Sequence, residues 1–259
     1  MAAPPLSSDP LRLDGKRALV TGASRGIGRA TAEAFAAAGA AAVAVNYARS
    51  TGEAESAGDA LRESGTEVEV IRADVSDPAQ VESMFEQLRA RWDGIDILVN
   101  NAAITHDGLA MLLGAQAWDE TLAVNLRGPF LCARHALRPM IKRRWGRIIN
   151  VVSPAALFGK AGAANYAAAK GGLLSFSKSL AREVGRYGIT VNAVCPGLID
   201  TRLIAGIPAE DRALHEREIA LGRFGTPAEV AQAIRFLASP AASYVSGATL
   251  VVDGGMTMA

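Results

Sequence analysis

Several features that would point to particular classes of protein are scarce in this chain of 259 residues. It contains two cysteines, Cys132 and Cys195, too few for a disulfide framework. Its three histidines show no metal-ligand spacing, so we expect no metal site. The 27 Lys and Arg residues against 26 Asp and Glu residues leave a formal net charge of +1. This balance argues against a nucleic-acid-binding protein that relies on a general basic field.

Membrane and secretion signals are also missing from the sequence. No uninterrupted apolar run approaches the roughly 18 residues that a membrane-spanning helix needs. The opening stretch, MAAPPLSSDP, has neither the charged region nor the apolar region of a signal peptide. We therefore expect a cytoplasmic protein that binds no membrane.

What the sequence does contain is a regular alternation of short apolar runs and longer amphipathic stretches, in a chain that is 50% hydrophobic. The runs predict strands at 17–21, 42–46, 67–71, 95–99, 147–152, 190–194 and 249–252. The amphipathic stretches predict helices at 27–38, 52–64, 77–92, 118–143, 165–186 and 226–237. Nearly continuous apolar strands that alternate with helices indicate a parallel sheet buried on both faces. We predict an α/β fold: one doubly wound, Rossmann-type domain (13–259) of about seven strands, after a flexible N-terminal arm (1–12).

A glycine-rich turn follows the first predicted strand, with the sequence TGASRGIG from Thr21 to Gly28. Glycine permits a tight turn and a close approach of the backbone to a diphosphate, which the following helix N-terminus would hold. The same letters fit the G-x-S-x-G elbow of a hydrolase with Ser24 as nucleophile. That elbow normally follows several strands, and this turn follows the first one, so nucleotide binding is favoured.

The residues after the second predicted strand bear on the choice of cofactor. An NAD-binding site is expected to place an acid near the end of this strand, but none precedes Glu53. Arg25 and Arg49 instead suit a 2′-phosphate, because guanidinium groups bind phosphate bidentately. The pattern predicts NADP(H), and the alternative is that both arginines are solvated surface residues.

Tyr166 and Lys170 form a candidate acid/base pair. They are four residues apart in a predicted helix and project from one face. A neighbouring ammonium would lower the phenol pKa and make Tyr166 a usable acid/base group. Ser153 follows a predicted strand and should lie at its carboxyl end, where ligands bind in such folds. On spacing alone, a Tyr/Lys pair on a helix is more often part of an ordinary amphipathic face.

Together these motifs resemble the short-chain dehydrogenase/reductase family, and within it the 3-oxoacyl-[acyl-carrier-protein] reductases. The resemblance extends from Leu13 to Met256 and rests on TGASRGIG (21–28), NNAA (100–103), VNL (124–126), YAAAK (166–170), CPG (195–197) and VDGG (252–255), with Ser153 thirteen residues before the tyrosine. It departs from the family pattern at Ala103 and Ala156, where glycine is usual, and at Pro154. These departures bear on substrate scope more than on activity.

The resemblance implies a role for each matching residue. Tyr166 would protonate the substrate carbonyl oxygen, Ser153 would orient it, and Lys170 would lower the tyrosine pKa and hold the nicotinamide ribose. Asn125 would anchor a water that links Lys170 to solvent. The implied NADP(H)-binding residues, besides Tyr166 and Lys170, are Gly22, Ser24, Arg25, Gly26, Ile27, Gly28, Asn46, Tyr47, Ala48, Arg49, Ser50, Asp74, Val75, Asn100, Ala102, Pro196, Gly197 and Thr201.

The resemblance also implies a substrate lid and partners. Residues 199–224 occupy the place of the lid, where Gly206 and Pro208 suit a mobile segment. A homotetramer would use the helices at 118–143 and 165–186 together with the C-terminal strand. Arg143 and Arg144 would form a docking patch for an acidic acyl carrier protein, with a second basic position displaced to Arg186. The alternative for this patch is a solvated helix end whose cations complement the helix dipole.

The expected function is NADPH-dependent reduction of a 3-oxoacyl thioester, carried by acyl carrier protein or coenzyme A, in fatty acid biosynthesis. One alternative is a reductase or dehydrogenase of the same mechanism that acts on a polyketide, a sugar or a steroid-like alcohol. A more remote alternative is a non-catalytic NADPH-binding subunit. The acid/base pair Tyr166–Lys170 argues against that last class, because a sensor has no need of it.

Overall fold

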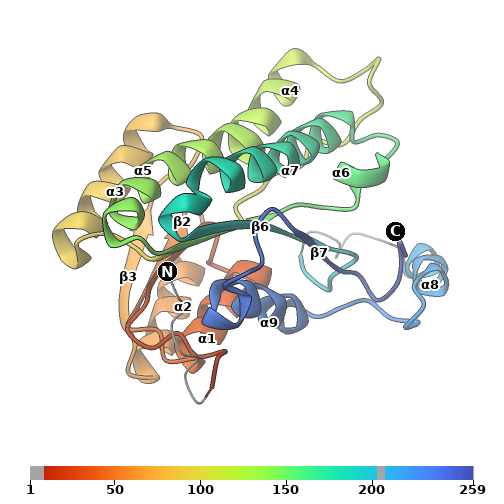
Figure 1. Ribbon diagram of the computed structural model, residues 1–259. Coiled ribbons are helices and arrows are strands. Elements are labelled where there is room, and N and C mark those ends of the chain that lie inside the picture. Colours follow the sequence, from red (N-terminus) through yellow and green to blue (C-terminus); the bar gives the residue numbers. More distant parts are fainter. Residues whose placement is uncertain (1–8, 203–207, 259) are drawn as a thin grey trace.

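A single seven-stranded parallel sheet forms the centre of the protein (Figure 1). The computed structural model describes residues 9–202 and 208–258. The strands are β1 (Arg17–Val20), β2 (Ala42–Tyr47), β3 (Glu67–Arg72), β4 (Ile97–Asn100), β5 (Gly146–Val151), β6 (Ile189–Pro196) and β7 (Thr249–Val252). Their order is β3-β2-β1-β4-β5-β6-β7, and every neighbouring pair is parallel. The predicted fold class is confirmed.

Helices cover both faces of this sheet. They are α1 (Gly26–Ala37), α2 (Thr51–Glu63), α3 (Pro78–Trp92), α4 (Ala115–Leu122), α5 (Gly128–Arg143), α6 (Ala155–Phe158), α7 (Ala164–Val184), α8 (Ala209–Glu218) and α9 (Pro227–Ala238). Figure 1 shows α1, α2 and α9 on one face and α3, α5 and α7 on the other, with α8 set apart near the C-terminus. Strands β2, β5 and β6 are buried along their whole length, which explains their continuous apolar character.

Two helix starts follow directly from the sequence. The Asp77 carboxylate accepts hydrogen bonds from the amides of Ala79 and Gln80, and Pro78 occupies the first helical position of α3. At α9, Thr226 and Glu229 form a reciprocal capping box. The cap-plus-proline pattern therefore predicted both starts correctly.

The helix expected at 118–143 differs from the prediction. It begins at Ala115 as α4, passes through a π-helical turn at Ala123–Arg127, and continues as α5. A π turn inserts one extra residue into the helix, which interrupts the i, i+4 pattern on which sequence periodicity depends. It contains Asn125, one of the predicted site residues.

The described part of the predicted N-terminal arm contacts the domain. The Pro10 carbonyl accepts a hydrogen bond from the Ala241 amide at 3.1 Å, and the Leu13 amide donates to the Ala38 carbonyl at 2.8 Å. Residues 1–8 and 203–207, which include Gly206 of the predicted lid, lie outside the described residues.

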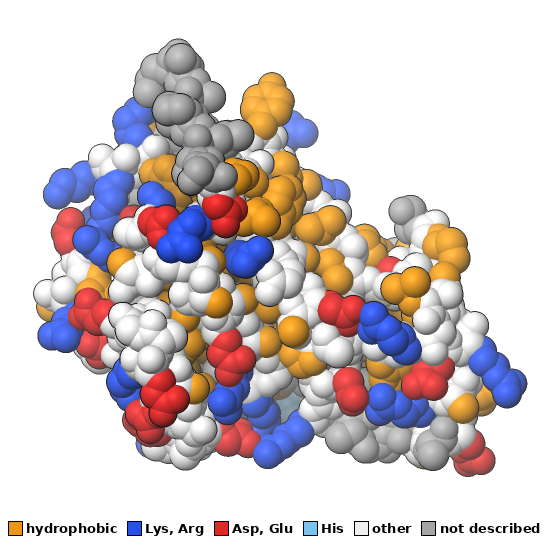
Figure 2. Space-filling model, turned by 90° about the horizontal axis from the view of Figure 1, so that it is seen from below, with side chains coloured by type: hydrophobic (Ala, Val, Ile, Leu, Met, Phe, Trp, Pro, Cys, Tyr) orange, Lys and Arg blue, Asp and Glu red, His pale blue; other side chains and the backbone are white. Residues whose placement is uncertain are grey.

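The surface carries both signs of charge. Figure 2 shows acidic and basic side chains interspersed on the face that it presents, in keeping with the net charge of +1. Within the described ranges no helix is long and apolar enough to cross a membrane. Nor do the described residues include a group of three or more His, Cys, Asp or Glu side chains that could hold a metal ion.

Candidate active site

The predicted site residues come from elements at the carboxyl edge of the sheet: the turns that follow β1 to β6, the last residues of β2 and β4, the π turn before α5, and α7. The strand order reverses between β1 and β4, because the chain proceeds outward to β3 on one side and to β7 on the other. Ligands of doubly wound sheets bind beside such a reversal. The glycine-rich turn follows β1 and lies at this point.

Two glycines of this turn are required by close contacts. A Cβ atom on Gly22 would lie 2.9 Å from Cα of Ala102, and one on Gly28 would overlap the Gly22 carbonyl oxygen. Gly22 also has a φ of +62° and Gly26 a φ of +57°, a region that favours glycine. A Cβ atom on Gly26 would be in ordinary van der Waals contact with Thr201, at 3.5 Å from its Cγ2. The conformation of the turn before α1 therefore depends on glycine at several positions.

Asn101 and Asn46 fix the conformation of the turn. The Asn101 side-chain amide donates to the carbonyls of Thr21 and Gly22, both at 3.0 Å. The Asn46 side-chain oxygen accepts from the Gly22 amide at 3.3 Å, while its nitrogen donates to the carbonyls of Ile71 and Ala73. Asn46 is thus a positioning residue inside the fold. Asn101 was missed by the sequence analysis, although its place directly after a strand in the Asn100–Asn101 pair was a usable signal.

Asn100, the predicted member of that pair, points into the core. It is buried, and its side-chain nitrogen donates to Asn150 at 2.8 Å. Asn150 in turn donates to the Ser177 hydroxyl of α7. Since successive residues of a strand point to opposite faces, only one asparagine of the pair can reach the turn. The side chain that contacts the glycine-rich turn is that of Asn101, and a contact between Asn100 and the cofactor stays a prediction.

The loop after β2 brings together the charged residues expected to read the adenosine ribose. Arg25 Nη1 lies 3.5 Å from the Ser50 hydroxyl and 3.1 Å from a Glu53 carboxylate oxygen. Arg49 is exposed and directly precedes Ser50. Both predicted arginines are therefore close to the start of α2, and the carboxylate of Glu53 lies in the same place. Tyr47 in the same loop is buried and Ala48 is exposed.

The predicted adenine-binding pair follows β3. The Asp74 carboxylate accepts from the amide and the hydroxyl of Ser76, which closes a local turn. Val75 is buried against α5, where a Cβ atom on Gly128 would lie 2.9 Å from Val75 Cγ2. The two residues lie at the carboxyl edge, and their contact with adenine stays a prediction.

Ser153, Tyr166 and Lys170 come together beyond the end of β5. The Ser153 hydroxyl oxygen accepts from the Ala155 amide at 3.3 Å, at the start of α6. Burial raises the pKa of the Tyr166 phenol above its ordinary value, and this effect outweighs the lowering by the Ser153 hydrogen bond. The phenol is therefore protonated at neutral pH.

Lys170 is fully enclosed beneath this pair. Its ammonium donates to the Val151 carbonyl at 2.8 Å and lies 5.8 Å from the centre of the Tyr166 ring. Burial lowers the pKa of Lys170 to about 8. Burial is the larger influence on the Tyr166 pKa in this structure, and a lowering of that pKa by Lys170 stays a prediction.

Asn125 is engaged at both ends of its side chain. Its oxygen accepts from the Ile104 amide at 2.9 Å, and its nitrogen donates to the Ile104 carbonyl at 2.8 Å. The π turn thereby holds the loop that follows β4. The anchoring of a water molecule by Asn125 stays a prediction.

The segment after β6 closes the other side of the site. Pro196 ends β6, and a Cβ atom on Gly197 would overlap Asp253 at 2.6 Å. Ile199 then bridges to Gly225, so the described ends of the predicted lid lie side by side. Helix α8 lies between these ends.

The basic run at the end of α5 lies at the opposite edge of the sheet. Arg143 binds the Asp96 carboxylate at 3.1 Å and the Ile95 carbonyl at 3.2 Å. Its contacts anchor the end of α5 to the start of β4, so the structure does not support the expectation of Arg143 as a docking cation. Arg144 is exposed and donates to the Arg186 carbonyl at 2.9 Å, which places these two arginines together.

Comparison with known proteins gives a consistent result. Residues 22–257 match a family model described as enoyl-(acyl carrier protein) reductase. The chain is 46% identical over 248 residues to the 3-oxoacyl-[acyl-carrier-protein] reductase FabG of Escherichia coli, covering 96% of this chain and 100% of the relative. It is 42% identical over 246 residues to the FabG of Aquifex aeolicus, covering 95% and 99%.

Solved structures show the same relationship. A gluconate 5-dehydrogenase from Burkholderia cenocepacia, in complex with NADP and tartrate, matches with a TM-score of 0.92 and 37% identity over 97% of this chain and 98% of that one. A short-chain type dehydrogenase/reductase from Mycobacterium marinum matches with a TM-score of 0.91 and 37% identity, covering 97% and 99%. With the glycine-rich turn and the Ser153–Tyr166–Lys170 group at one edge of the sheet, these matches show that the chain belongs to the short-chain dehydrogenase/reductase family.

Proposed function

We propose that this protein reduces a 3-oxoacyl thioester to the 3-hydroxyacyl thioester with NADPH, in fatty acid biosynthesis. The observation that carries the proposal is the enclosed group of Ser153, Tyr166 and Lys170 at the sheet edge that also carries the glycine-rich turn. The identity of 42% to 46% to curated 3-oxoacyl-[acyl-carrier-protein] reductases supports the substrate class.

The residues of the turn fit a dinucleotide. Gly22 and Gly28 keep the turn tight, and a diphosphate would be held at the N-terminus of α1. Arg25 and Arg49 would hold the 2′-phosphate, and Lys170 the nicotinamide ribose. When bound, the nicotinamide supplies a hydride to the carbonyl carbon of the substrate.

The protein's own residues supply the proton and the orientation. The Ser153 hydroxyl donates a hydrogen bond to the substrate carbonyl oxygen and holds it next to Tyr166. The Tyr166 phenol transfers its proton to that oxygen as the alcohol forms. The phenol is protonated at neutral pH and can therefore donate its proton as negative charge develops on the oxygen. Lys170, beneath the ring, stabilises the phenolate that remains.

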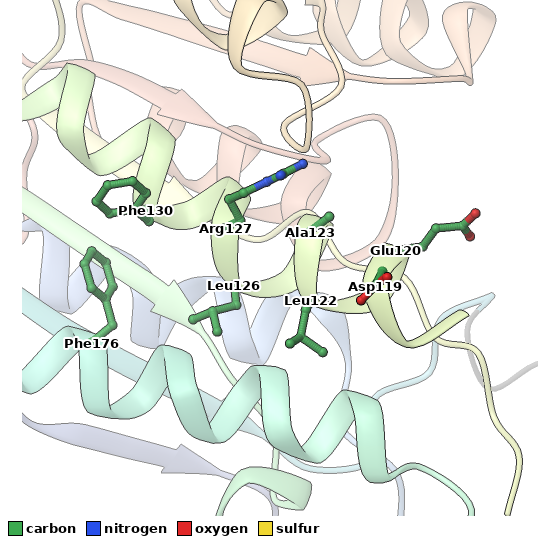
Figure 3. Close-up of a pocket in the computed structure, with 8 residues that line it drawn as sticks. All are labelled: Asp119, Glu120, Leu122, Ala123, Leu126, Arg127, Phe130 and Phe176. Carbon is green, nitrogen blue, oxygen red and sulfur yellow. The ribbon is translucent and has the colours of Figure 1, made fainter. Parts of the chain in front are cut away.

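We further propose that the protein is a homo-oligomer, in keeping with the homotetramer expected from the sequence. In this assembly a second copy covers the face of α4, α5 and α7. This face carries an open groove of about 750 Å³ between the helices (Figure 3). Leu122 and Leu126 point from the groove toward α7, and the rings of Phe130 and Phe176 meet edge to face at 6.2 Å. Phe130 is 45% exposed. An apolar face of this kind favours a protein partner over solvent.

The carrier-protein proposal now rests on Arg144 and Arg186. Both lie near the amino edge of the sheet, and the six residues of β5 separate Arg144 from the Ser153 edge. At about 3.3 Å per residue this strand spans roughly 20 Å. Docking of a carrier protein at these arginines would be salt-dependent, because they are exposed.

One observation favours a second candidate function, the reduction of a keto group in a small sugar acid. A gluconate 5-dehydrogenase shares the fold with a TM-score of 0.92 and 37% identity. The higher identity to the 3-oxoacyl reductases makes the thioester the first choice.

Tyr166→Phe tests the assignment of the proton donor. The variant keeps the ring and removes the hydroxyl, so turnover should fall by about a thousandfold or more, while NADPH binds with nearly unchanged affinity. Initial rates and a fluorescence titration with NADPH measure the two effects separately. Turnover within about tenfold of the parent would contradict the role of Tyr166.

A further inference from the structure

Glu53 joins two arginines from distant parts of the chain. One carboxylate oxygen lies 3.1 Å from Nη1 of Arg25 in the glycine-rich turn, and the other lies 2.5 Å from Nη1 of Arg202. Glu53 itself belongs to the first turn of α2. The carboxylate thus connects the turn after β1, the helix after β2 and the segment after β6.

The backbone brings Arg202 to this position. Its neighbour Thr201 faces Gly26, where the Cβ position lies 3.5 Å from Thr201 Cγ2. The Asp200 amide donates to the Gly225 carbonyl at 2.8 Å, and this bond anchors the same segment from the other side. These contacts hold the segment beside the glycine-rich turn, and Arg202 lies next to that turn as a result.

Positive charge exceeds negative charge in the cluster around Glu53. Arg25 and Arg202 contact its carboxylate. Arg49 lies four residues before Glu53, in the loop whose Ser50 contacts Arg25. Burial opposes ionisation of Glu53, but the hydrogen bond from Arg25 and the charge of Arg202 lower its pKa overall. Two guanidinium groups thus contact a single carboxylate, and this cluster keeps a net positive charge.

These ion pairs are exchangeable. The side chains of Arg25 and Arg202 are 54% and 71% exposed, and exposed pairs contribute little to stability. A phosphate monoester carries a charge of about −1.5 to −2 and three strong acceptor oxygens, more than a carboxylate offers. A 2′-phosphate that enters the cluster would therefore displace Glu53 from its arginines.

We propose that Arg202 is a third arginine of the 2′-phosphate site, and that Glu53 competes with the phosphate for Arg202 and Arg25. Arg202 thus adds to the preference for NADPH over NADH, and Glu53 limits that preference. The inference rests on the proposed placement of the cofactor. It also makes 2′-phosphate recognition depend on the segment that leads into the substrate side of the site.

Equilibrium titration of the purified full-length protein with NADPH and with NADH tests the proposal. Arg202→Met should raise the Kd for NADPH about tenfold at low salt, since it removes a charge-assisted contact. The Kd for NADH should stay within a factor of about two. Glu53→Gln should lower the Kd for NADPH about fivefold, because a negative charge near the phosphate is removed. Arg89→Met, an exposed arginine of α3, is the matched control and should change neither Kd.

Three results would overturn the proposal. An unchanged Kd for NADPH in Arg202→Met would remove Arg202 from the site. An equal loss for NADPH and NADH would place Arg202 at the diphosphate. Weaker NADPH binding in Glu53→Gln would show that Glu53 organises the arginines and does not compete for them. Because each readout is binding, a protein that binds NADPH but reduces no thioester would refute the proposed function and leave this inference standing.

Discussion

Lys170→Met should stabilise the protein near neutral pH while it abolishes activity. Burial lowers the pKa of Lys170 from 10.5 to about 8, so the charged ammonium costs the folded state about 3 kcal/mol. Methionine has a similar length and no charge, but it leaves the Val151 carbonyl without its donor, a loss of about 1 kcal/mol. The free energy of unfolding should therefore rise by about 2 kcal/mol near neutral pH.

The pH dependence gives the sharper test. Between about pH 8 and pH 10.5 the unfolded chain binds more protons at Lys170 than the folded protein, so the wild-type protein gains stability as the pH rises. The variant lacks this gain. The excess in the free energy of unfolding of Lys170→Met over wild type should therefore shrink above about pH 8. It should become a deficit of about 1 kcal/mol once the wild-type lysine is neutral in both the folded and the unfolded state.

Urea unfolding at several pH values and one fixed protein concentration measures this difference. Lys178→Met, an exposed lysine on the same helix α7, is the control and should shift stability by less than about 0.5 kcal/mol at every pH. A Lys170→Met variant that is less stable than wild type near neutral pH would refute the reasoning. So would a difference that does not change with pH.

Three further predictions concern the cofactor, the oligomer and the direction of reaction. Arg25→Ala combined with Arg49→Ala should reduce the ratio of kcat/KM for NADPH to that for NADH by about a hundredfold, and an unchanged ratio would place the 2′-phosphate elsewhere. Phe130→Asp puts a charge in the groove of Figure 3, so light scattering should detect smaller particles than for wild type; a parent-sized oligomer would argue against this face as the interface. Oxidation of a 3-hydroxyacyl thioester needs the Tyr166 phenolate, whose pKa is raised, so its kcat should increase with pH up to or beyond the ordinary phenol range. A plateau already at neutral pH would contradict that shift.

The sequence predicted the features that local chemistry determines. Alternating apolar runs identified the seven strands, and Asp77–Pro78 and Thr226–Pro227 identified two helix starts, because caps depend on neighbouring residues alone. The spacing of Tyr166 and Lys170 placed both on one face of α7.

Features that depend on tertiary contacts were not predictable in this way. The π turn at Asn125 depends on contacts with the loop at Ile104, far along the chain, and no local periodicity reports it. Which asparagine of the Asn100–Asn101 pair faces the turn depends on the strand's face, and a shift of one residue reverses it. The sequence does not report the pairing of Arg143 with Asp96, because the two residues are 47 positions apart and meet only in the folded protein.

The most direct test of the proposed reaction follows the absorbance of NADPH with purified protein and acetoacetyl thioesters of acyl carrier protein and coenzyme A, with NADH in parallel. We expect oxidation of NADPH in strong preference to NADH, faster with the carrier-protein thioester than with the coenzyme A thioester. No oxidation with either thioester, in a protein that binds NADPH, would contradict the 3-oxoacyl reductase function and favour another ketone as substrate.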